Sequence, residues 1–570
     1  MINGLTRSIG LLLAIFCLFN DGYGQATNKN GRLINVKDHQ AVGDGTTDDT
    51  AAIQAAISHA AAGDTVFIPE GSYLVRSLGL KSGTHIKGEG MLIQRVEGVK
   101  EEVTTEKQNS SMPLFRGHNV DNVFLSVRAQ TVYEAAYFSG SKNISISHST
   151  LLGDPTNPRS FSGLLFYDCE NIDVANTKIS FYGAPRELPD VYQRGTAIRV
   201  LSSRDIRVEH CEITQNGENG IFMHGTPDGA VENNIISNNG MSAIQVAFGT
   251  TGKEKNYRFI KNVMEGNAAD AIDINNRSAR PHWDINCHIE DNLSRNNGFV
   301  KGQSTPDGSG IATLINLSGV TMLNNVAAGN NRPALYIENC GKIYASGNKA
   351  DNQVEVVLQF DELRLEDNSF GSISLLANVD GKKLLMHNNQ LYSMSLPNGI
   401  KVDSLILSSN LISKATLNFN MTGNIRLKEN TINSHSKDGA LLLVKVNSAY
   451  LERNIITSLG SYAISTRKTA ENVEILDNDI NSVNACILDD GAVGLRVIGN
   501  KLLSLEGGGF RHTVVSRSPD RLVLSKNEHT TTPKHAAIYL EGQGTAEIIS
   551  EKIISGAVDY GTVDVKTSLK

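Results

Sequence analysis

The apolar positions of this chain recur in short phrases, each of which alternates apolar residues with residues of other kinds. Seven phrases are centred on apolar residues separated by steps of 33, 23, 23, 28, 39 and 24 positions: Leu165, Ile198, Ile221, Ile244, Ile272, Ile311 and Leu335. A strand phrase that returns at a fixed phase is typical of a solenoid. The alternation predicts strands with one face turned inward. We therefore expect a bare coil of about 23 residues, with insertions wherever the step is longer.

Each coil carries further strand phrases. A second one recurs as Asn171-Ile172-Asp173-Val174 and Asp205-Ile206-Arg207-Val208, and a third lies beside an Asn pair, as in Glu232 to Gly240. Asn tolerates the left-handed backbone that tight corners need, and stacked Asn amides can hydrogen-bond along a ladder. Three short strands per turn with Asn at a repeated corner predict an all-β, three-faced parallel β-helix.

The first part of the chain, residues 34–90, reads as a distinct cap with the first coils. Thr46-Thr47-Asp48-Asp49 precedes the Ala-rich run from Ala51 to Ile57, a pattern that favours a helix start. Strand phrases follow at Thr65–Pro69, Tyr73–Val75 and Thr84–Gly88. Because the end of a solenoid exposes core and unpaired strand edges, we expect this short helix to cover it. The parallel β-helix is then predicted over residues 91–565.

Composition supports a β-rich exported protein. The chain has 52 Gly, a formal net charge of -7 and a pI near 6.1, so nothing is basic enough for nucleic acid. An apolar run from Ile9 to Phe19 and the small residues Gly22 and Gly24 predict a cleaved signal peptide over residues 1–24 and a secreted or periplasmic protein. That run is shorter than the ~20 residues that span a bilayer, so we expect no membrane insertion. We also expect a monomer. The odd, scattered Cys169, Cys211, Cys287, Cys340 and Cys486 fit core fillers better than a disulfide framework.

The cap also carries a resemblance. It reads Asn35-Val36-Lys37-Asp38, then Gly43-Asp44-Gly45, then Thr47-Asp48-Asp49-Thr50, and ends in Ala-Ile-Gln-Ala-Ala-Ile. This resembles the N-terminal signature of the pectate-lyase-like superfamily, which includes rhamnogalacturonases, polygalacturonases, mannuronan C5-epimerases and phage tailspikes. The resemblance implies a right-handed parallel β-helix that handles polysaccharide. It does not select a reaction, because one fold hosts several.

The reaction phrases of these relatives are only partly present. Where mannuronan epimerases carry Asp-Pro-His, this chain matches the histidine alone, as His224, and Phe222 takes the place of the Asp. The Asp of the next coil falls on Ala247, and the paired Asp of polygalacturonases falls on Ala269-Asp270. The resemblance therefore implies neither of these two standard mechanisms.

The coil register predicts a polar patch on the outside of the middle coils. With the Ile positions inward, alternation places Arg199, Phe222, Gln245 and Asp273 in one outward column, and Leu201, His224, Ala247 and Asn275 in the next. Asn219 and Asp270 fall at the entering corner. Coils stack ~4.8 Å apart, so these side chains would share a surface a few sugar rings long.

Insertions flank this patch in the sequence and predict groove walls. The first runs from Phe181 to Arg194, the second contains Gly249–Lys255, and the third follows Ile272. Aromatic and Arg side chains there suit stacking on sugar rings and pairing with carboxylates. The predicted substrate-binding residues are Asn219, Gln245, Asn275, Arg277, Arg280, His282, Trp283, Tyr182 and Arg194. Tyr336 and Glu338 follow no long insertion and rank lower, and Asp489-Asp490 is predicted to be a turn.

Three functions fit the patch. A lyase acting on a uronate polysaccharide is favoured, with His224 as base, Arg199 and Arg277 on the substrate carboxylate, and Asp270 and Asp273 as proton or metal ligands. Asp270, Asp273 and Asn275 offer oxygens of the kind that Ca²⁺ accepts, so the pattern allows calcium but establishes no cofactor. A glycoside hydrolase would use Asp270 and Asp273 as a carboxyl pair ~6.5–9.5 Å apart. The third function is a non-catalytic surface protein that binds glycan.

Overall fold

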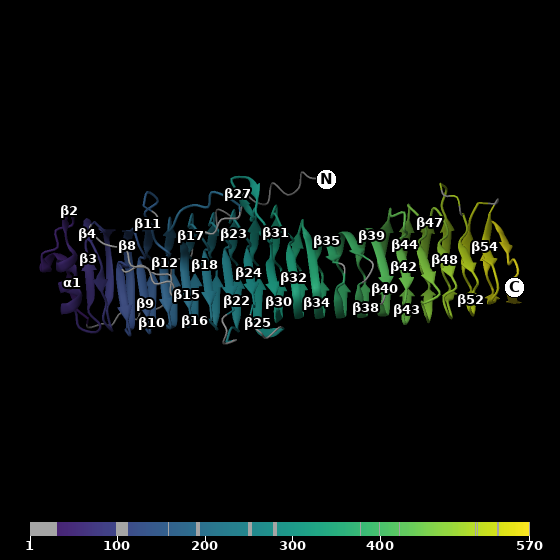
Figure 1. The fold of residues 1–570 in the computed structure, drawn as a ribbon, viewed down its shortest axis with the longest axis horizontal. Helices are drawn as coiled ribbons and strands as arrows, with labels where there is room; N and C mark the ends of the chain where they lie inside the picture. Colours follow the sequence, from purple (N-terminus) through teal and green to yellow (C-terminus); the bar gives the residue numbers. More distant parts are fainter. Residues whose placement is uncertain are drawn as a thin grey trace.

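The computed structural model describes residues 31–97, 112–157, 159–189, 194–248, 253–277, 282–376, 378–397, 400–420, 422–507, 509, 511–532 and 535–568. The predicted signal peptide lies outside these residues. The chain winds into a long rod, with α1 (Thr50–His59) at one end and the C-terminus at the other (Figure 1). Within the described ranges, no helix has the length and apolar character needed to cross a bilayer.

Three parallel sheets run along the rod as a right-handed β-helix, as predicted. In the first half of the rod, sheet 1 contains β7 (Phe115–His118), β9 (Ala136–Ser139), β12 (Ser162–Tyr167), β15 (Thr196–Leu201), β18 (Ile221–His224), β21 (Ile244–Ala247), β24 (Ile272–Asn275), β29 (Ala312–Ile315) and the start of β32 (Leu335–Ser346). Sheet 2 contains β8 (Asp121–Thr131), β10 (Lys142–Ser147), β13 (Glu170–Ala175), β16 (Arg204–Glu209), β19 (Gly229–Glu232), β22 (Tyr257–Ile260), β25 (Trp283–Glu290) and β30 (Leu317–Leu323). Sheet 3 contains β11 (Thr150–Gly153), β14 (Lys178–Ser180), β17 (Glu212–Thr214), β20 (Ile235–Ser237), β23 (Val263–Glu265), β26 (Leu293–Arg295) and β31 (Val326–Ala328).

The same three sheets continue to the end of the rod. Long strands that bend round a corner come first: β34 (Gln353–Glu366), β35 (Ser369–Leu375), β37 (Gln390–Leu396) and β39 (Leu411–Asn420). The strands between and after them are β33 (Lys349–Ala350), β36 (Asp380–His387), β38 (Lys401–Ser408), β40 (Thr422–Lys428), β41 (Thr431–Ser434), β42 (Leu441–Val444), β43 (Ser448–Glu452), β44 (Ile455–Ser458), β45 (Ile464–Arg467), β46 (Val473–Leu476), β47 (Asp479–Ser482), β48 (Ile487–Asp490), β49 (Arg496–Ile498), β50 (Lys501–Ser504), β51 (Val514–Arg517), β52 (Leu522–Ser525), β53 (Glu528–Thr530), β54 (Ala536–Glu541), β55 (Thr545–Ile549), β56 (Lys552–Ile553), β57 (Ala557–Asp559) and β58 (Asp564–Ser568).

The predicted core register is confirmed at five of its seven positions. Ile198, Ile221, Ile244 and Ile272 pair in sequence, and Leu335 continues their column. Leu165 and Ile311 are each one residue off, because Leu164 pairs with Ile198 and Ala312 pairs with Leu335. Gly163-Leu164-Leu165 and Ile311-Ala312 offer two apolar neighbours, so alternation alone could not choose between them. Asp489-Asp490 also differs from the prediction, since both residues lie in strand β48 and not in a turn.

Two ladders of Asn amides hold the corners of the coils together. In each ladder, one Asn Nδ2 donates to the Oδ1 of the next coil's Asn, at 2.9 Å between Asn239 and Asn267. The long ladder lies between sheets 2 and 3 and contains Asn234, Asn262, Asn292, Asn325, Asn348, Asn368, Asn389, Asn410, Asn430, Asn454, Asn478, Asn500 and Asn527. The short ladder lies between sheets 3 and 1 and contains Asn216, Asn239, Asn267, Asn297 and Asn330.

The sequence predicts two roles for Asn, the left-handed turn and the amide ladder, and the structure gives these roles to two neighbouring residues. Asn233 and Asn238 adopt left-handed backbone at φ 59° and 54°, and the following Asn234 and Asn239 supply the ladder amides. The amide ladder is therefore confirmed, with the left-handed turn one residue earlier. The described cysteines are also confirmed as buried and unpaired, and burial raises the pKa of the Cys169 thiol to about 11.

The structure of the cap shows why the residues of its sequence signature are needed. It contains β1 (Leu33–Asn35), the 3₁₀ helix η1 (Val36–His39), β2 (Asp44–Asp48), α1, β3 (Thr65–Ile68), β4 (Ser72–Val75), β5 (Leu78–Gly79) and β6 (His85–Gln94). Helix α1 packs Ile53, Ala56 and Ile57 onto the end of the core, as expected. The Asp49 carboxylate makes no cap bond to the helix and instead accepts hydrogen bonds from the backbone N–H groups of Val42 (2.6 Å) and Gly43 (3.1 Å). Asp49 therefore fixes the Gly-Asp-Gly loop.

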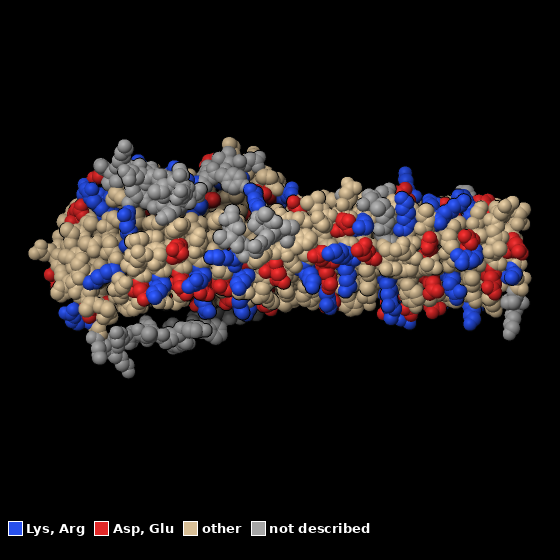
Figure 2. Space-filling model, turned by 60° about the horizontal axis from the view of Figure 1, so that its bottom comes forward, with Lys and Arg blue, Asp and Glu red and all other residues tan. Residues whose placement is uncertain are grey.

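Acidic and basic side chains are interspersed along the face drawn in Figure 2. Many form pairs between neighbouring coils, such as Glu170–Arg204 at 2.6 Å and Asp380–Lys401 at 3.1 Å, with both partners exposed. Exposed pairs of this kind contribute ~0–1 kcal/mol each. The folded state therefore depends mainly on the core and the buried ladders.

Candidate active site

Insertions flank sheet 1 on both sides in the middle coils. On the entering side, residues 181–195 lie between β14 and β15, and residues 296–311, with the hairpin β27 (Phe299–Val300) and β28 (Gln303–Ser304), lie between β26 and β29. On the other side, where the chain leaves sheet 1 for sheet 2, the connections from β21 to β22 and from β24 to β25 are also long. Strands β15, β18, β21, β24 and β29 therefore form a floor between these insertions.

The predicted outward columns are confirmed on this floor. Arg199 pairs with Phe222, Phe222 with Gln245, and Gln245 with Asp273. The second column runs through Leu201, His224, Ala247 and Asn275 in the same coils. The columns continue to Thr313 and Tyr336, and to Ile315 and Glu338. The floor thus extends two coils beyond Asp273 and includes the Tyr336–Glu338 pair, in which the phenol donates to the carboxylate at 2.6 Å.

Arg199 is on the floor but faces a protein carboxylate. It is 6% exposed, and its Nη2 donates to Glu218 Oε2 at 2.6 Å and to Thr196 Oγ1 at 2.9 Å. Its guanidinium also lies 5.1 Å from the ring centre of Phe222. The predicted role of Arg199, neutralisation of a substrate carboxylate, would require its guanidinium to exchange Glu218 for the substrate. Glu218 was missed in the sequence, although it directly precedes Asn219.

Asp270 is buried at the entering corner and held by the insertion after β26. Its Oδ1 accepts hydrogen bonds from the backbone N–H groups of Gly308 (3.0 Å) and Ser309 (2.6 Å) and from the Thr313 hydroxyl (3.2 Å). Its Oδ2 accepts no hydrogen bond from any described residue. Burial raises the pKa of Asp270, and the two backbone N–H groups oppose that rise by stabilising the carboxylate.

Asp273, three residues further along the same coil, is 8% exposed. Burial, and then the neighbouring Asp270 carboxylate, raise its pKa to about 8, while the hydrogen bond from Gln245 and the charge of Arg277 act in the opposite direction. Its Oδ2 accepts from Gln245 Nε2 at 2.7 Å. Its Oδ1 is buried and has no hydrogen-bond partner in the described part of the chain. A pKa of about 8 favours the neutral acid at Asp273 at neutral pH, and Oδ1 of this acid has no partner among the described residues.

Asn219 and Gln245, predicted to contact substrate, bind each other. Asn219 Nδ2 donates to Gln245 Oε1 at 3.0 Å, and Asn219 Oδ1 accepts from the backbone N–H of Ser242 at 3.0 Å. Gln245 then donates to Asp273. Asn275, the next outward residue after Asp273, keeps a buried Oδ1 without a partner among the described residues.

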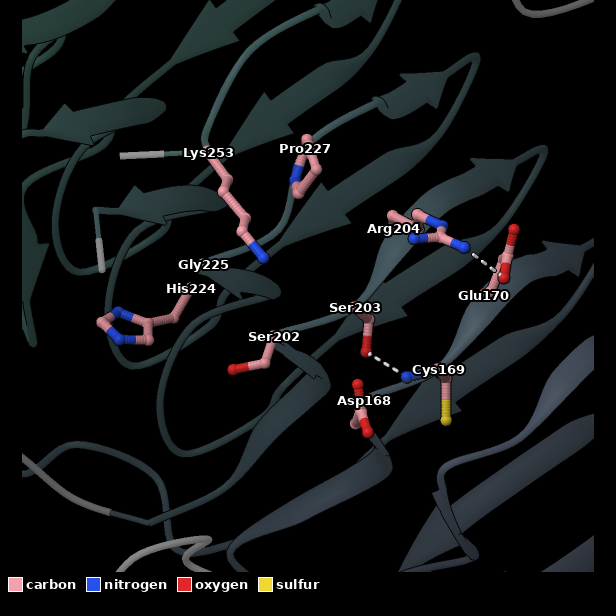
Figure 3. Close-up of a pocket in the computed structure, with 10 residues that line it drawn as sticks. All are labelled: Asp168, Cys169, Glu170, Ser202, Ser203, Arg204, His224, Gly225, Pro227 and Lys253. Atoms are coloured by element: carbon pink, nitrogen blue, oxygen red, sulfur yellow. Dashed lines mark hydrogen bonds and ion pairs between the residues drawn. The ribbon is translucent and has the colours of Figure 1, made fainter. Parts of the chain in front are cut away.

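His224 belongs to a different hollow, at the corner between sheets 1 and 2. This hollow of about 350 Å³ is lined by Asp168, Cys169, Glu170, Ser202, Ser203, Arg204, His224, Gly225, Pro227 and Lys253 (Figure 3). The His224 ring stacks on Phe222 with 6.4 Å between centres. Arg204 is paired with Glu170 there, whereas Lys253 is exposed and has no ion pair within the described ranges. His224 thus lies two coils from Asp273, and the structure does not join the predicted base to the carboxyl pair.

The first insertion forms a wall through residues other than the expected Tyr182. The expectation that Tyr182 faces the groove is wrong: its side chain is fully buried in the core, and its hydroxyl accepts from Thr131 Oγ1 at 3.3 Å. Arg186 is also buried and donates to the carbonyl of Gly240 at 3.3 Å. Glu187 forms an ion pair with Lys301 in the β27–β28 hairpin. The two insertions on the entering side therefore contact each other above sheet 1.

The remaining predicted wall residues are spread over both corners. Arg194 is exposed and lies 4.0 Å from the Phe161 ring centre, and Arg277 is exposed beyond β24. His282 Nε2 bonds Asn339 Oδ1 at 3.1 Å, and its Nδ1 lies 3.3 Å from Asp361. Trp283 Nε1 donates to the Glu254 carbonyl at 2.9 Å, which ties two insertions together. Arg280, which was also predicted to bind substrate, lies outside the described residues.

The carboxylates do not form an evident calcium site. The described residues contain no group of three or more His, Cys, Asp or Glu side chains arranged to hold a metal ion. Asp270 Oδ1 already accepts three hydrogen bonds from protein groups. Calcium dependence stays an untested prediction.

Comparisons with known proteins give a family match and short local similarities. Residues 33–299 match the family described as rhamnogalacturonase A/epimerase, pectate lyase-like. Mannuronan C5-epimerase AlgE1 of Azotobacter vinelandii is 49% identical over 83 residues, which cover 12% of this chain and only 6% of that protein. The plasmin- and fibronectin-binding protein A of Streptococcus pneumoniae is 52% identical over 58 residues, which cover 10% of this chain and 8% of that protein. Short matches of this kind therefore reach both an enzyme and a binding protein.

Among solved structures, the family 28 exopolygalacturonase of Yersinia enterocolitica aligns with 65% of this chain and 79% of its own, at 14% identity and a TM-score of 0.40. A similarity at this level carries no argument about activity. The match over residues 33–299 and the three-sheet coil that carries it support the resemblance of this chain to the pectate-lyase-like superfamily of parallel β-helix proteins.

Proposed function

We propose that this protein cleaves an acidic, uronate-containing polysaccharide on the floor of sheet 1, and that Asp270 and Asp273 carry the reaction as a hydrolytic carboxyl pair. The observation that supports this most directly is the environment of Asp273. Its carboxyl is shielded from water and lies beside a second carboxyl, and burial together with that neighbour raises its pKa to about 8. Carboxyls whose environments favour a neutral acid beside an ionised partner are typical of glycoside hydrolases.

In this scheme Asp273 is the general acid and Asp270 the general base. The glycosidic C1–O bond breaks, and the leaving oxygen takes the proton of Asp273. Water attacks C1 and gives its proton to Asp270, whose Oδ2 remains available because the backbone of Gly308 and Ser309 binds only Oδ1. Asp273 ends as a carboxylate and Asp270 as an acid, so one proton exchange with solvent restores the pair.

An acidic substrate is proposed on two grounds. Exposed Arg194 and Arg277 lie beside the floor, and Arg side chains pair well with uronate carboxylates. In addition, the local sequence match is to mannuronan C5-epimerases, whose name refers to a uronate polymer. A polymer of this kind is met outside the cytoplasm, which agrees with the predicted export signal.

The experiment is a screen of pectic, alginate and sulfated polysaccharides with the full chain, read by reducing-end release and by the ultraviolet absorbance of unsaturated uronate. Hydrolysis creates reducing ends without that absorbance. Asp273→Asn and Asp270→Asn should each lower turnover by roughly 10²–10⁴-fold, whereas the exposed Asp380→Asn should not. Polysaccharide binding without turnover, or full turnover in Asp273→Asn, would contradict the proposal.

A lyase is the second candidate, and the hollow in Figure 3 favours it. The ring nitrogens of the half-buried His224 have no hydrogen-bond partner in the described ranges, and Lys253 lines the same hollow. His224 would remove the C5 proton and Lys253 would stabilise the uronate carboxylate. This reaction predicts unsaturated products and loss of turnover in His224→Ala. Hydrolysis by the carboxyl pair predicts saturated products and retained turnover in the same variant.

A further inference from the structure

We infer that Asn219 and Gln245 form an amide relay that holds the proton of Asp273 on Oδ1, and that both act as positioning residues. The inference rests on the proposed function, because it concerns the acid of that reaction. It changes the role of two residues whose types alone suggest sugar binding. The amide of Asn219 contacts the amide of Gln245 on the next coil, and the amide of Gln245 contacts the Asp273 carboxyl. In each amide, the positions of the oxygen and the nitrogen are determined by the neighbouring groups.

The direction of the relay starts at a backbone group. The N–H of Ser242 can only donate, so the Asn219 atom that it meets at 3.0 Å must be the oxygen Oδ1. Asn219 Nδ2 then faces Gln245 at 3.0 Å, so the atom of Gln245 that it meets must be Oε1. This leaves Gln245 Nε2 facing Asp273 Oδ2 at 2.7 Å. Neither amide can flip without placing two donors or two acceptors together.

The last step assigns the proton. An oxygen that accepts a hydrogen bond from Gln245 at 2.7 Å cannot also direct an acid hydrogen at the same amide. A neutral Asp273 therefore carries its hydrogen on Oδ1, the buried oxygen that no described protein group contacts. A carboxyl without this relay would place its hydrogen on either oxygen. The relay thus fixes which oxygen of Asp273 carries the hydrogen.

Other groups around Asp273 affect its charge but not the choice of oxygen. Asp270 and Asp307 disfavour ionisation, and Arg277 favours it. Gln245 is distinguished from them because it contacts one oxygen directly. Removing its N–H therefore has two effects: the carboxylate loses a donor that stabilises it, and the acid loses its preferred orientation.

The test compares Gln245→Met with a matched control, Gln353→Met. Gln353 also extends from sheet 1 and donates to a carboxylate, Glu355, at 2.9 Å, but it lies four coils further along the rod than Gln245. In Gln245→Met we expect kcat to fall by about tenfold with little change in KM, and the alkaline limb of the pH profile to rise by about 1 unit. Gln353→Met should leave both unchanged.

A double variant tests whether Asn219 acts through Gln245, as a relay requires, or independently of it. Asn219→Leu should shift kcat and the alkaline limb in the same direction as Gln245→Met, because the released Gln245 amide can rotate away from Asp273. Asn219→Leu combined with Gln245→Met should equal Gln245→Met alone. Additive losses would overturn the relay, since they would mean that Asn219 acts without Gln245.

A second readout does not need activity. The difference in Tm between the parent chain and Asp273→Asn, followed against pH, reports the ionisation of Asp273. The midpoint of this difference should rise when Gln245→Met is introduced into both chains, and an unchanged midpoint would overturn the relay. Loss of turnover in Asp273→Asn with an unchanged pH profile in Gln245→Met would disprove the relay alone. Full turnover in Asp273→Asn with a raised midpoint would disprove the hydrolytic scheme and keep the relay.

Discussion

The middle coils and the later coils of this rod share one scaffold but differ in what they carry on sheet 1. Successive Asn residues of the long ladder are 28, 30 and 33 residues apart between Asn234 and Asn325. They are 20 or 21 residues apart between Asn348 and Asn430. The ladder amides keep the same 2.9–3.0 Å contacts in both regions. Insertions at the corners of sheet 1 therefore leave the opposite corner unchanged.

The short ladder shows what the middle coils add. Its five Asn residues lie at the corner that leads into sheet 1, and only in the coils from Asn216 to Asn330. Asn267 lies three residues before Asp270, and Asn297 immediately precedes the β27–β28 insertion. Corners that must carry long insertions are thus fixed by a second set of buried amides. The later coils, with short corners, have no such ladder among their described residues at this position.

Two buried aspartates give the strongest test of this difference. Asp273 points outward from sheet 1 in the middle coils, whereas Asp489 points into the core in the later coils and accepts from Thr466 (2.7 Å) and Ser516 (2.6 Å) hydroxyls. Burial raises the pKa of both. We expect Asp273→Asn to lower kcat by roughly 10²–10⁴-fold. Asp489→Asn should leave kcat near the parent value but lower Tm, because at either position its new N–H₂ group replaces an oxygen that now accepts a hydrogen bond.

Steady-state rates on the substrate found by the screen, normalised to folded protein by circular dichroism, check this prediction. Equal losses of kcat in the two variants would mean that any buried aspartate affects turnover through stability. The contrast between a reactive floor and a structural core would then fail.

The two ladders provide a test with a smaller effect. Asn267 in the short ladder and Asn389 in the long ladder each donate from the side chain to the next Asn and to a carbonyl, and each accepts from the preceding coil. Replacing either by Leu leaves buried donors and acceptors without partners. We expect a loss of about 3 kcal/mol in unfolding free energy for each.

Only Asn267→Leu should also affect turnover. Asp270 follows it by three residues, and misplacing a reacting carboxyl by a fraction of an ångström lowers the rate by about tenfold or more. Denaturant unfolding and kcat, measured on both variants, give the comparison. If Asn389→Leu lowered kcat as much as Asn267→Leu, the later coils would be part of the active region.

The outward columns could be predicted from the sequence because they need only alternation and coil counting. Ile198, Ile221, Ile244 and Ile272 are each followed by one outward residue, and this placed Arg199, Gln245 and Asp273 together. The count failed at Leu164-Leu165 and Ile311-Ala312, where adjacent apolar residues satisfy either register. The ladder corner was also predictable, since Asn pairs recur at its position.

The partners of the floor residues could not be predicted. Arg199 has the same outward position whether it meets a substrate or Glu218, and only the fold of the corner before β18 decides between them. Tyr182 lies in an insertion with aromatic and charged residues, but its side chain turns inward. Alternation does not extend into such connections. Asp270, by contrast, was placed correctly at the corner, while its three donors come from residues 38, 39 and 43 positions later.

The smallest expected effect is a difference between the two regions in how the Tm of their aspartate variants depends on pH. The folded-state pKa of Asp273 lies above that of an unfolded aspartate, so the folded chain keeps a proton that the unfolded chain releases between about pH 4 and pH 8. Stability therefore falls as pH rises through this window. Asn in place of Asp273 resembles the neutral acid, so Asp273→Asn should gain Tm over the parent chain as pH rises from 5 to 8.5, with no gain near pH 4.

Asp489→Asn should lose Tm over the whole range, because at Asp489 two hydroxyls and one backbone N–H already donate to the carboxylate. A pH-independent Tm difference for Asp273→Asn would show that this carboxyl is ionised in the folded chain, and the floor of sheet 1 would then lack its acid.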